Sequence, residues 1–446
     1  MKRPRIVMVG GGSYSWAPRI VKDLMLTPSL RDAEFVLYDI NRRAADRVAG
    51  ALAHVQAEVG GESKVIPTDR RAKAFNGADY FVITISTGGL KSMAHDIAIP
   101  ERYGIYHTVG DTSGPGGWAR LVRNFGVIKK LAEDMNRHAP GAMVLNYTNP
   151  MSTLTDVLSR VCEGPVVGLC HGLFENLRFL KDFYRLKSED ELSVDYAGLN
   201  HFVWLTKIRT RRRDLLADLR RRLRRQSLTD LLAEAHADVM GFKSDRELAT
   251  ELFRLTGVMP YLGDRHTCEF LPGYITSRKN MKRYRISRTP IKARVAGFKR
   301  REANVAKWAK KGLPDGFVTR SRETAADIIS AHFESRSFID VGNVPNRGQV
   351  RGLPEGTVVE TAVRVDANGF SPIVAGPLPE VVLGMLEPYA RVFRMGVDAC
   401  FRGDRELALG ALRLDPVTSH LNGAEVREMG TKLLRAHKKF IRCFKV

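Results

Sequence analysis

Two short segments of this chain carry side chains that could hold a metal ion. The stretch GLCHGL, residues 168–173, places the Cys170 thiol beside the His171 imidazole, and GLNHFVW, residues 198–204, carries His201 in a similar apolar setting. Thiolate and imidazole are both ligands of transition metals. The residues alone leave a second interpretation open, in which Cys170 is a buried, inert thiol and His201 is a core histidine.

A glycine-rich turn near the start of the chain predicts a dinucleotide-binding site. In VGGGSYSWAP, residues 9–18, Gly10 would form the tight turn and Gly12 would let a pyrophosphate approach backbone N–H groups. The small Ser15 stands at the third glycine position. The next strand ends at Asp39, whose carboxylate can accept a hydrogen bond from a ribose 2′-OH and would repel a 2′-phosphate. The pattern favours NAD over NADP, the alternative being a glycine-rich turn without a ligand.

The first half of the chain alternates strands and helices. Apolar strands are expected at residues 4–10, 34–40, 78–86, 142–148 and 164–171, and helices at 42–59, 118–137, 150–161 and from Ala17 onward. This order predicts a Rossmann-type α/β fold with a parallel sheet covered on both faces. We expect an NAD-binding domain over residues 1–190. The remainder, 191–446, is expected to be an α+β domain for catalysis, substrate binding and oligomerisation.

The composition describes a soluble, globular and very basic chain. Hydrophobic residues make up 44% of the 446, charged residues 27%, and the formal net charge is +22. Much of this charge lies in residues 209–226, where leucines recur at helical spacing and arginines fill the other faces, which predicts a solvated helix. No nucleic-acid-binding motif accompanies the charge. Five cysteines without C-x-x-C spacing, and no long apolar run, favour a reducing, cytoplasmic location without membrane contact.

A second ligand-binding turn is expected after the fourth strand. Asn149 in NYTNP opens a helix at the carboxyl edge of the sheet, where ligands bind in such folds. The Asn-Pro turn resembles that of lactate and malate dehydrogenases, so an NAD-dependent 2-hydroxy-acid dehydrogenase is one alternative. Such an enzyme would have no use for Cys170. The expected cofactor-binding residues are Gly10, Gly12, Ser13, Asp39 and Asn149.

Seven motifs together identify a family resemblance over nearly the whole chain. They are GGGS at 10–13, GDTSGPGG at 110–117, NYTNP at 146–150, GLCHG at 168–172, GLNHF at 198–202, GDRHTCEFLP at 263–272 and NVPNRGQVRGLPEGTVVE at 343–360. The chain resembles family 4 of the glycoside hydrolases, the NAD- and divalent-metal-dependent group that departs from two-carboxylate chemistry. The resemblance implies that Cys170 and His201 hold Mn²⁺ or another divalent metal.

The resemblance also implies a reaction that begins with hydride transfer. The sugar C3 hydroxyl is oxidised by NAD, a base removes the acidified C2 proton, the aglycone leaves by elimination, and water addition and re-reduction complete the turnover. Tyr261, Asp264 and His266 are the candidates for the base, and Asp264 is favoured, since an alternating pattern puts it on one face with His266. His171 is the expected acid for the leaving group.

The pattern Cys-His-Gly-Leu at 170–173 resembles the subgroup that acts on α-linked hexuronic acids. We expect a galacturonide first and a glucuronide second, with an α-glucosidase or α-galactosidase of the same family as the alternative. A substrate carboxylate would call for a bidentate arginine, Arg265 or Arg120. Either arginine could instead pair with Asp264 structurally. The expected substrate-binding residues are Asn149, Arg265, His266 and Arg120, and a homodimer or homotetramer is expected.

Overall fold

The first half of the chain forms a parallel sheet in the computed structural model, which describes residues 3–234 and 246–445. The strand order β3-β2-β1-β4-β5-β6 is that of a Rossmann sheet, and every pair in it is parallel. The strands are β1 Arg5–Val9, β2 Glu34–Tyr38, β3 Lys64–Thr68, β4 Tyr80–Ile83, β5 Met143–Asn146 and β6 Val166–Gly168. The predicted fold class is therefore confirmed.

One strand of this sheet, β3, was not expected from the sequence. Its residues KVIPT include Pro67, and only Thr68 is buried. Both features suit an edge strand, where a proline costs no ladder hydrogen bond and an apolar run is not required. The five predicted apolar runs form β1, β2, β4, β5 and β6.

Helices cover both faces of the parallel sheet, as predicted. Successive β1 side chains alternate between two apolar cores, with Val7 and Val9 in one core and Ile6 and Met8 in the other. The helices of this half are α1 Ala17–Met25, α2 Arg42–Val59, α3 Arg71–Phe75, α4 Gly89–Glu101, α5 Gly114–His138 and α6 Met151–Val161, with the 3₁₀ turn η1 Pro28–Leu30.

The second half of the chain extends the same sheet with antiparallel strands. The order continues β6-β10-β11-β7-β8-β9, and β12 pairs with β11. These strands are β7 Ser193–Leu199, β8 Phe202–Arg209, β9 Met259–Pro260, β10 Phe338–Pro345, β11 Val358–Asp366 and β12 Gly369–Pro372. One sheet therefore runs through both halves, with β10 and β11 between β6 and β7.

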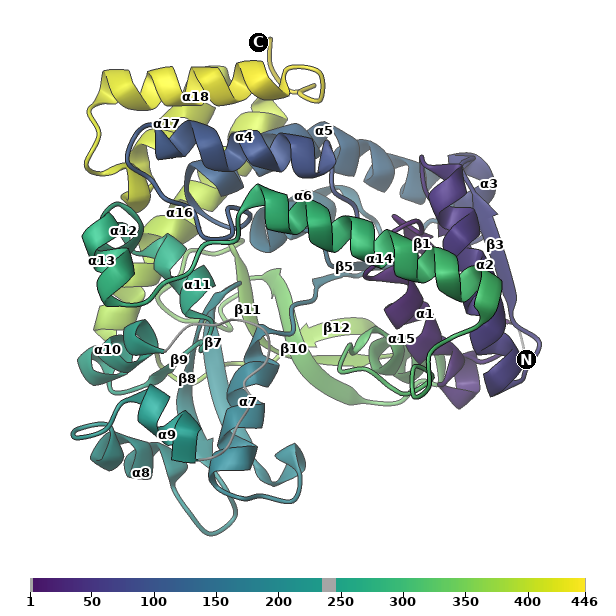
Figure 1. Ribbon diagram of the computed structural model, residues 1–446, viewed down its shortest axis with the longest axis horizontal. Helices are drawn as coiled ribbons and strands as arrows, with labels where there is room; N and C mark the ends of the chain where they lie inside the picture. The colour runs from purple at the N-terminus through teal and green to yellow at the C-terminus, as the bar shows by residue number, and fades with distance from the viewer. Residues whose placement is uncertain (1–2, 235–245, 446) are drawn as a thin grey trace.

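The remaining helices follow β6 in the chain (Figure 1). They are α7 Gly172–Phe183, α8 Leu215–Arg222, α9 Leu228–Glu234, α10 Glu247–Thr256, α11 Asp264–Thr267, α12 Pro272–Ile275, α13 Arg278–Arg283, α14 Ile291–Lys311, α15 Ala325–Phe333, α16 Glu380–Arg402, α17 Arg405–Leu414 and α18 Gly423–His437, with η2 Glu189–Glu191, η3 Cys268–Phe270 and η4 Pro416–Thr418. Helix α14 packs along α2 of the first half, and α16, α17 and α18 pack together at the C-terminal end.

Of the arginine-rich segment 209–226, only Leu215–Arg222 form a helix, α8, and it has the predicted burial pattern. Leu215, Leu216 and Leu219 are buried, as is Leu223 just after the helix, while Arg220, Arg221 and Arg222 lie on its outer side. Two of these arginines pair with Asp218. Within residues 3–234 and 246–445, no helix is long and apolar enough to cross a bilayer.

Candidate functional site

The glycine-rich turn after β1 is held tightly against the next two strands of the sheet. The backbone N–H groups of Gly10 and Gly11 both donate to the Tyr38 carbonyl at 2.9 Å. Gly10 has φ +94°, and a Cβ there would lie 2.8 Å from the Thr84 carbonyl oxygen. Only glycine fits at this position without moving β4. The turn is therefore built as a close backbone approach, which is what a pyrophosphate-binding loop requires.

Asp39 lies at the end of β2 directly beside this turn. One of its carboxylate oxygens accepts from the Gly12 N–H at 2.9 Å, and the other accepts from the Asn41 N–H at 2.8 Å. A Cβ on Gly12 would lie only 2.8 Å from the Asp39 carboxylate. The Ser13 hydroxyl makes a hydrogen bond within the same segment, where it accepts from the Trp16 N–H at 3.3 Å. The structure thus brings together four of the five expected cofactor residues.

The fifth expected cofactor residue, Asn149, lies at the same carboxyl edge, after β5. The loops after β4 and β5 are tied together, because the Ile85 N–H donates to the Thr148 hydroxyl at 3.1 Å. The Asn149–Pro150 peptide bond is cis. A guanidinium nitrogen of Arg120 lies 3.5 Å from the Asn149 carbonyl oxygen. This loop therefore connects the glycine-rich turn with the polar groups of α5.

Three side chains from distant segments form a cluster that could hold a metal ion. Ligand atoms of Asp111, His201 and His266 all lie within 4.8 Å of one another. The two imidazole rings are 3.9 Å apart, centroid to centroid, and the Thr112 hydroxyl lies 2.8 Å from His201 Nδ1. Imidazole nitrogens with a carboxylate oxygen suit a divalent transition metal. Cys170 does not belong to this three-residue group.

Cys170 and the cluster both lie near the Tyr261 ring. The Tyr261 ring stacks on His201 at a centroid distance of 6.1 Å. A Cβ on Gly172 would lie 3.2 Å from the same ring and 3.5 Å from the Cys170 sulfur. Burial, reinforced by the Glu360 carboxylate, raises the pKa of the Cys170 thiol, so a bound cation would have to displace its proton. Tyr261 thus lies next to both expected metal ligands.

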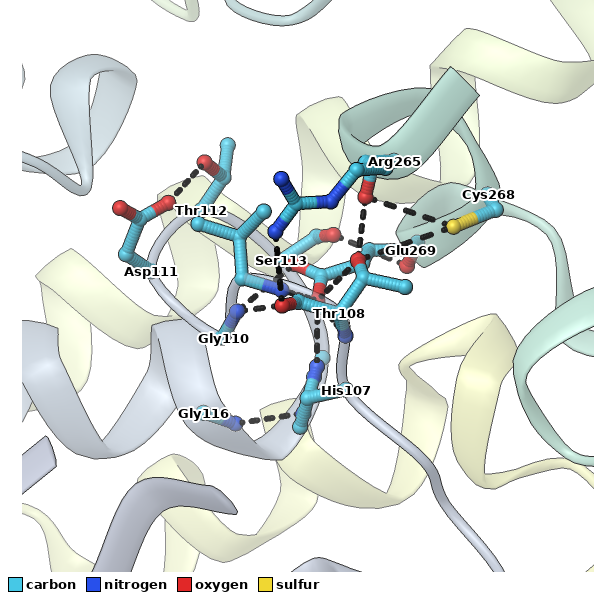
Figure 2. A network of polar contacts seen from close by, with 12 residues as sticks. His107, Thr108, Gly110, Asp111, Thr112, Ser113, Gly116, Arg265, Cys268 and Glu269 are labelled. Carbon is cyan, nitrogen blue, oxygen red and sulfur yellow. Dashed lines mark hydrogen bonds and ion pairs between the residues drawn. The ribbon is translucent and has the colours of Figure 1, made fainter. Parts of the chain in front are cut away.

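The loop that carries Asp111 is fixed by the buried carboxylate of Glu269 (Figure 2). Its Oε1 accepts from the backbone N–H groups of Thr108, Val109 and Gly110 at 2.7, 2.8 and 2.9 Å, and lies 3.2 Å from His107 Nδ1. Burial by itself would raise the pKa of Glu269, but the charge interaction with His107 and these hydrogen bonds outweigh burial and lower it. The 264–270 segment therefore both supplies His266 and positions Asp111.

Three arginines, Arg120, Arg265 and Arg294, interact electrostatically with Asp111. Burial by itself would raise the pKa of this carboxyl, but Arg120 and the other nearby cationic groups outweigh burial and hold it at about 2. Arg265 donates to the Ser287 carbonyl at 3.0 Å and Arg294 to the Val109 carbonyl at 3.2 Å, so both side chains are partly engaged with backbone. The Arg120 side chain is 8% exposed, and its Nε has no hydrogen-bond partner among the described residues.

Asp264, the favoured base, is engaged elsewhere. Its two carboxylate oxygens accept from the Leu248 and Ala249 N–H groups at 3.0 and 3.1 Å, which caps the first turn of α10. Burial raises its pKa to about 7, although Arg246 and these bonds oppose the rise. The alternating pattern expected for this segment was wrong, because residues 264–267 form the short helix α11. Asp264 and His266 consequently point to different partners.

His171, the expected acid, is the most accessible of the expected site residues. Its side chain is 47% exposed, and Nδ1 lies 3.6 Å from a Glu323 carboxylate oxygen. Its ring is 6.0 Å from that of Trp16, in the segment after the glycine-rich turn. The residue therefore lies where the cofactor turn and the end of β6 meet. The sequence did not single out Asp111, Arg294, Glu269 or Glu360, although all of these except Arg294 stand in quoted motifs.

The sheet order and the glycine-rich turn place this chain in the class of dinucleotide-binding Rossmann enzymes. A malate dehydrogenase from Plasmodium falciparum superposes with a TM-score of 0.52 at 13% identity, covering 92% of this chain and 99% of that one. The comparison confirms the dehydrogenase-like fold. Models of the family 4 glycosyl hydrolases match residues 5–185, and those of their C-terminal domain match 196–418. The chain belongs to this family and is a glycosidase.

Individual relatives are similar to this chain over almost its full length. An α-galacturonidase of Bacillus subtilis is 32% identical, with 93% of each chain covered. The crystal structure of a protein described as the putative glucosidase lplD from Bacillus subtilis has a TM-score of 0.88 at 29% identity, covering 97% of this chain and all of that one. A 6-phospho-α-glucosidase from gut microorganisms, solved with NAD and Mn²⁺, has a TM-score of 0.82 at 21% identity, covering both chains fully.

Proposed function

We propose that this glycosidase hydrolyses α-linked galacturonides with NAD and a divalent metal, preferably Mn²⁺. The observation that carries the substrate class is that Arg120, Arg265 and Arg294 all interact electrostatically with Asp111 of the candidate metal cluster. Arg120 is the best placed to bind a sugar carboxylate, since it is nearly buried and its Nε lacks a partner among the described residues. The name of the Bacillus subtilis relative points to the same substrate.

The residues present fit both cofactors. The glycine-rich turn leaves no room for side chains where a pyrophosphate would approach, and Asp39 lies beside it as a ribose-binding acid would. For the metal, Cys170 and His201 remain the proposed ligands, and Asp111 and His266 add a carboxylate and a second imidazole next to His201. When bound, NAD would accept the C3 hydride and the metal would stabilise charge on the neighbouring sugar oxygens.

Among the three candidates for the C2 base, the geometry favours Tyr261. Its ring lies against His201 and close to Cys170, whereas both oxygens of Asp264 accept hydrogen bonds from α10. Burial raises the pKa of Tyr261, and a nearby metal cation would act in the opposite direction. His171, the most exposed of the expected site residues, is proposed to protonate the leaving-group oxygen.

The test is a substrate panel with NAD, Mn²⁺ and a thiol reductant. We expect release of galacturonic acid from α-linked galacturonides, slower release from glucuronides, and no net NADH. A faster reaction with neutral galactosides or glucosides would support the alternative within the family. Rising NADH without a free sugar acid would support the 2-hydroxy-acid dehydrogenase instead.

Arg120→Gln tests the carboxylate contact. Losing a charge-assisted bidentate bond should lower kcat/KM for the uronide by about tenfold or more. The same variant should change turnover of a neutral galactoside much less. Equal losses on both substrates would show that Arg120 does not recognise the carboxylate.

The chain's organisation and setting complete the proposal. We propose a division near residue 190 into a cofactor domain and a catalytic domain, and a homodimer or homotetramer in the cytoplasm without nucleic-acid or membrane partners. Light scattering after size exclusion would report the oligomeric state. Limited proteolysis that releases a stable fragment ending near residue 190 would support the division.

A further inference from the structure

Glu360 is a buried carboxylate that accepts hydrogen bonds from two neutral side-chain amides. It lies on β11, is 1% exposed, and makes no ion pair among the described residues. Its Oε2 accepts two hydrogen bonds, from the side-chain amides of Asn200 at 3.0 Å and Asn343 at 3.1 Å. Burying a carboxylate costs free energy when only neutral amides hydrogen bond to it. A buried carboxylate in such a setting indicates a specific role.

The two amides belong to the segments that carry the proposed metal ligands. Asn200 immediately precedes His201 in the turn between β7 and β8, and its side chain lies close enough to Cys170 to act on the pKa of the thiol. Asn343 lies on β10, and its amide also approaches the carbonyl of Gly168 at 3.4 Å. Gly168 is the last residue of β6, two residues before Cys170.

The sheet register places Glu360 between these segments. Gly168 of β6 pairs with Asn343 of β10, Asn343 pairs with Glu360 of β11, and Glu360 pairs with Gly198 of β7. One row of directly opposed residues therefore crosses four neighbouring strands. Cys170 follows this row at one end, and His201 follows it at the other.

We propose that Glu360 is a positioning residue whose carboxylate oxygen, through Asn200 and Asn343, sets the separation of Cys170 and His201 for metal binding. The inference rests on the proposed metal ligands. Backbone pairing alone fixes the strands, but it leaves the turn at Asn200 and the end of β6 free to shift. His201 has φ +63°, a conformation that a non-glycine residue holds only where its surroundings enforce it.

The test compares two substitutions that differ in their ability to accept hydrogen bonds. Glu360→Gln keeps a carbonyl oxygen that can receive both amides, whereas Glu360→Met keeps the length and removes the acceptor. We expect the dissociation constant for Mn²⁺, measured from the electron paramagnetic resonance signal of free Mn²⁺, to rise at least tenfold in Glu360→Met and to stay within a few-fold of wild type in Glu360→Gln. NAD affinity and the melting temperature should be the same as those of wild type in both variants.

A second readout reports on the thiolate directly. With Co²⁺ in place of Mn²⁺, the thiolate-to-metal absorption band should weaken in Glu360→Met and persist in Glu360→Gln. Thr361→Val, at the next residue of β11 and on the opposite face, is the matched control and should leave metal binding unchanged. Unchanged Mn²⁺ affinity in Glu360→Met, or an equal loss in Glu360→Gln, would overturn the proposal.

The failure of the proposed metal site would look different. If neither Cys170→Ser nor His201→Asn weakens Mn²⁺ binding, the ligand assignment itself is wrong. If Cys170→Ser and His201→Asn both weaken Mn²⁺ binding while Glu360→Met binds Mn²⁺ as wild type does, the ligand assignment is supported. Only the positioning role of Glu360 is then wrong.

Discussion

The imidazole rings of His201 and His266 lie 3.9 Å apart, centroid to centroid, although the two residues come from the β7–β8 turn and from α11. Burial lowers the pKa of both rings, and that of His201 lies well below its usual value. Neutral imidazoles have a lone pair available, which is the form that a metal ion binds. The fold thus holds two potential ligands in their binding-competent protonation state.

The lowered pKa of His201 makes the metal-free protein sensitive to acid. Below pH ~6.5 the unfolded chain binds a proton at this histidine, while the folded protein does not. The free energy of unfolding therefore decreases as the pH is lowered, by up to about 1.4 kcal/mol per pH unit. We expect His201→Asn, which tolerates the positive φ, to flatten this part of the profile. Urea unfolding between pH 7.5 and pH 5 measures it. Parallel profiles for both proteins would contradict the assignment.

Replacing Cys170 by serine should remove most activity while the fold persists. A serine hydroxyl stays protonated and is a poor ligand where a thiolate would bind. We expect weaker Mn²⁺ binding, unchanged NAD binding and an unchanged circular dichroism spectrum. Oxidation of the native thiol should inactivate in the same way. Full turnover with undiminished metal affinity in Cys170→Ser would remove this residue from the metal site.

The origin of the C2 proton separates Tyr261 from Asp264. Hydrolysis in heavy water should leave deuterium at C2 of the released uronic acid, because the base exchanges with solvent. Tyr261→Phe should lower both deuterium incorporation and hydrolysis by roughly 100-fold or more, since the phenyl ring cannot accept a proton. Mass spectrometry of the product measures the incorporation.

Asp264→Asn is the matched comparison for this experiment. The amide oxygen can still accept from one of the two N–H groups of α10, so the variant should fold, with reduced stability, and keep exchanging C2 at a rate near that of wild type. If instead Asp264→Asn abolishes exchange and Tyr261→Phe does not, Asp264 is the base and its contacts with α10 are secondary.

The glycine-rich turn should tolerate no side chain. In Gly12→Ala the new methyl group would lie 2.8 Å from the Asp39 carboxylate and 2.7 Å from the Ala44 methyl, so NAD affinity should fall about tenfold or more. Fluorescence titration with NADH measures the change. Gly410→Ala, in α17 with no atom near the added Cβ, is the control and should bind as wild type does. Equal affinities for all three proteins would place the cofactor elsewhere.

The sequence by itself determined the Rossmann half and the family. Apolar runs bounded by turns predicted five of the six parallel strands, and α2 begins and ends at the expected residues, because both signals are local. Edge strand β3 lacks such a run and escaped detection. The motifs around Cys170 and His201 identified the glycosidase family directly.

Only the tertiary structure decided which polar groups meet. Asp111 joins His201 and His266 because Glu269 fixes its loop, and Asp264 turns to α10 because its segment is a helix and not a strand. Glu360 lies between the two ligand-bearing segments because four strands come into register. These contacts join residues far apart in the chain. Their partners follow from packing and from the satisfaction of buried polar groups, which no local pattern encodes.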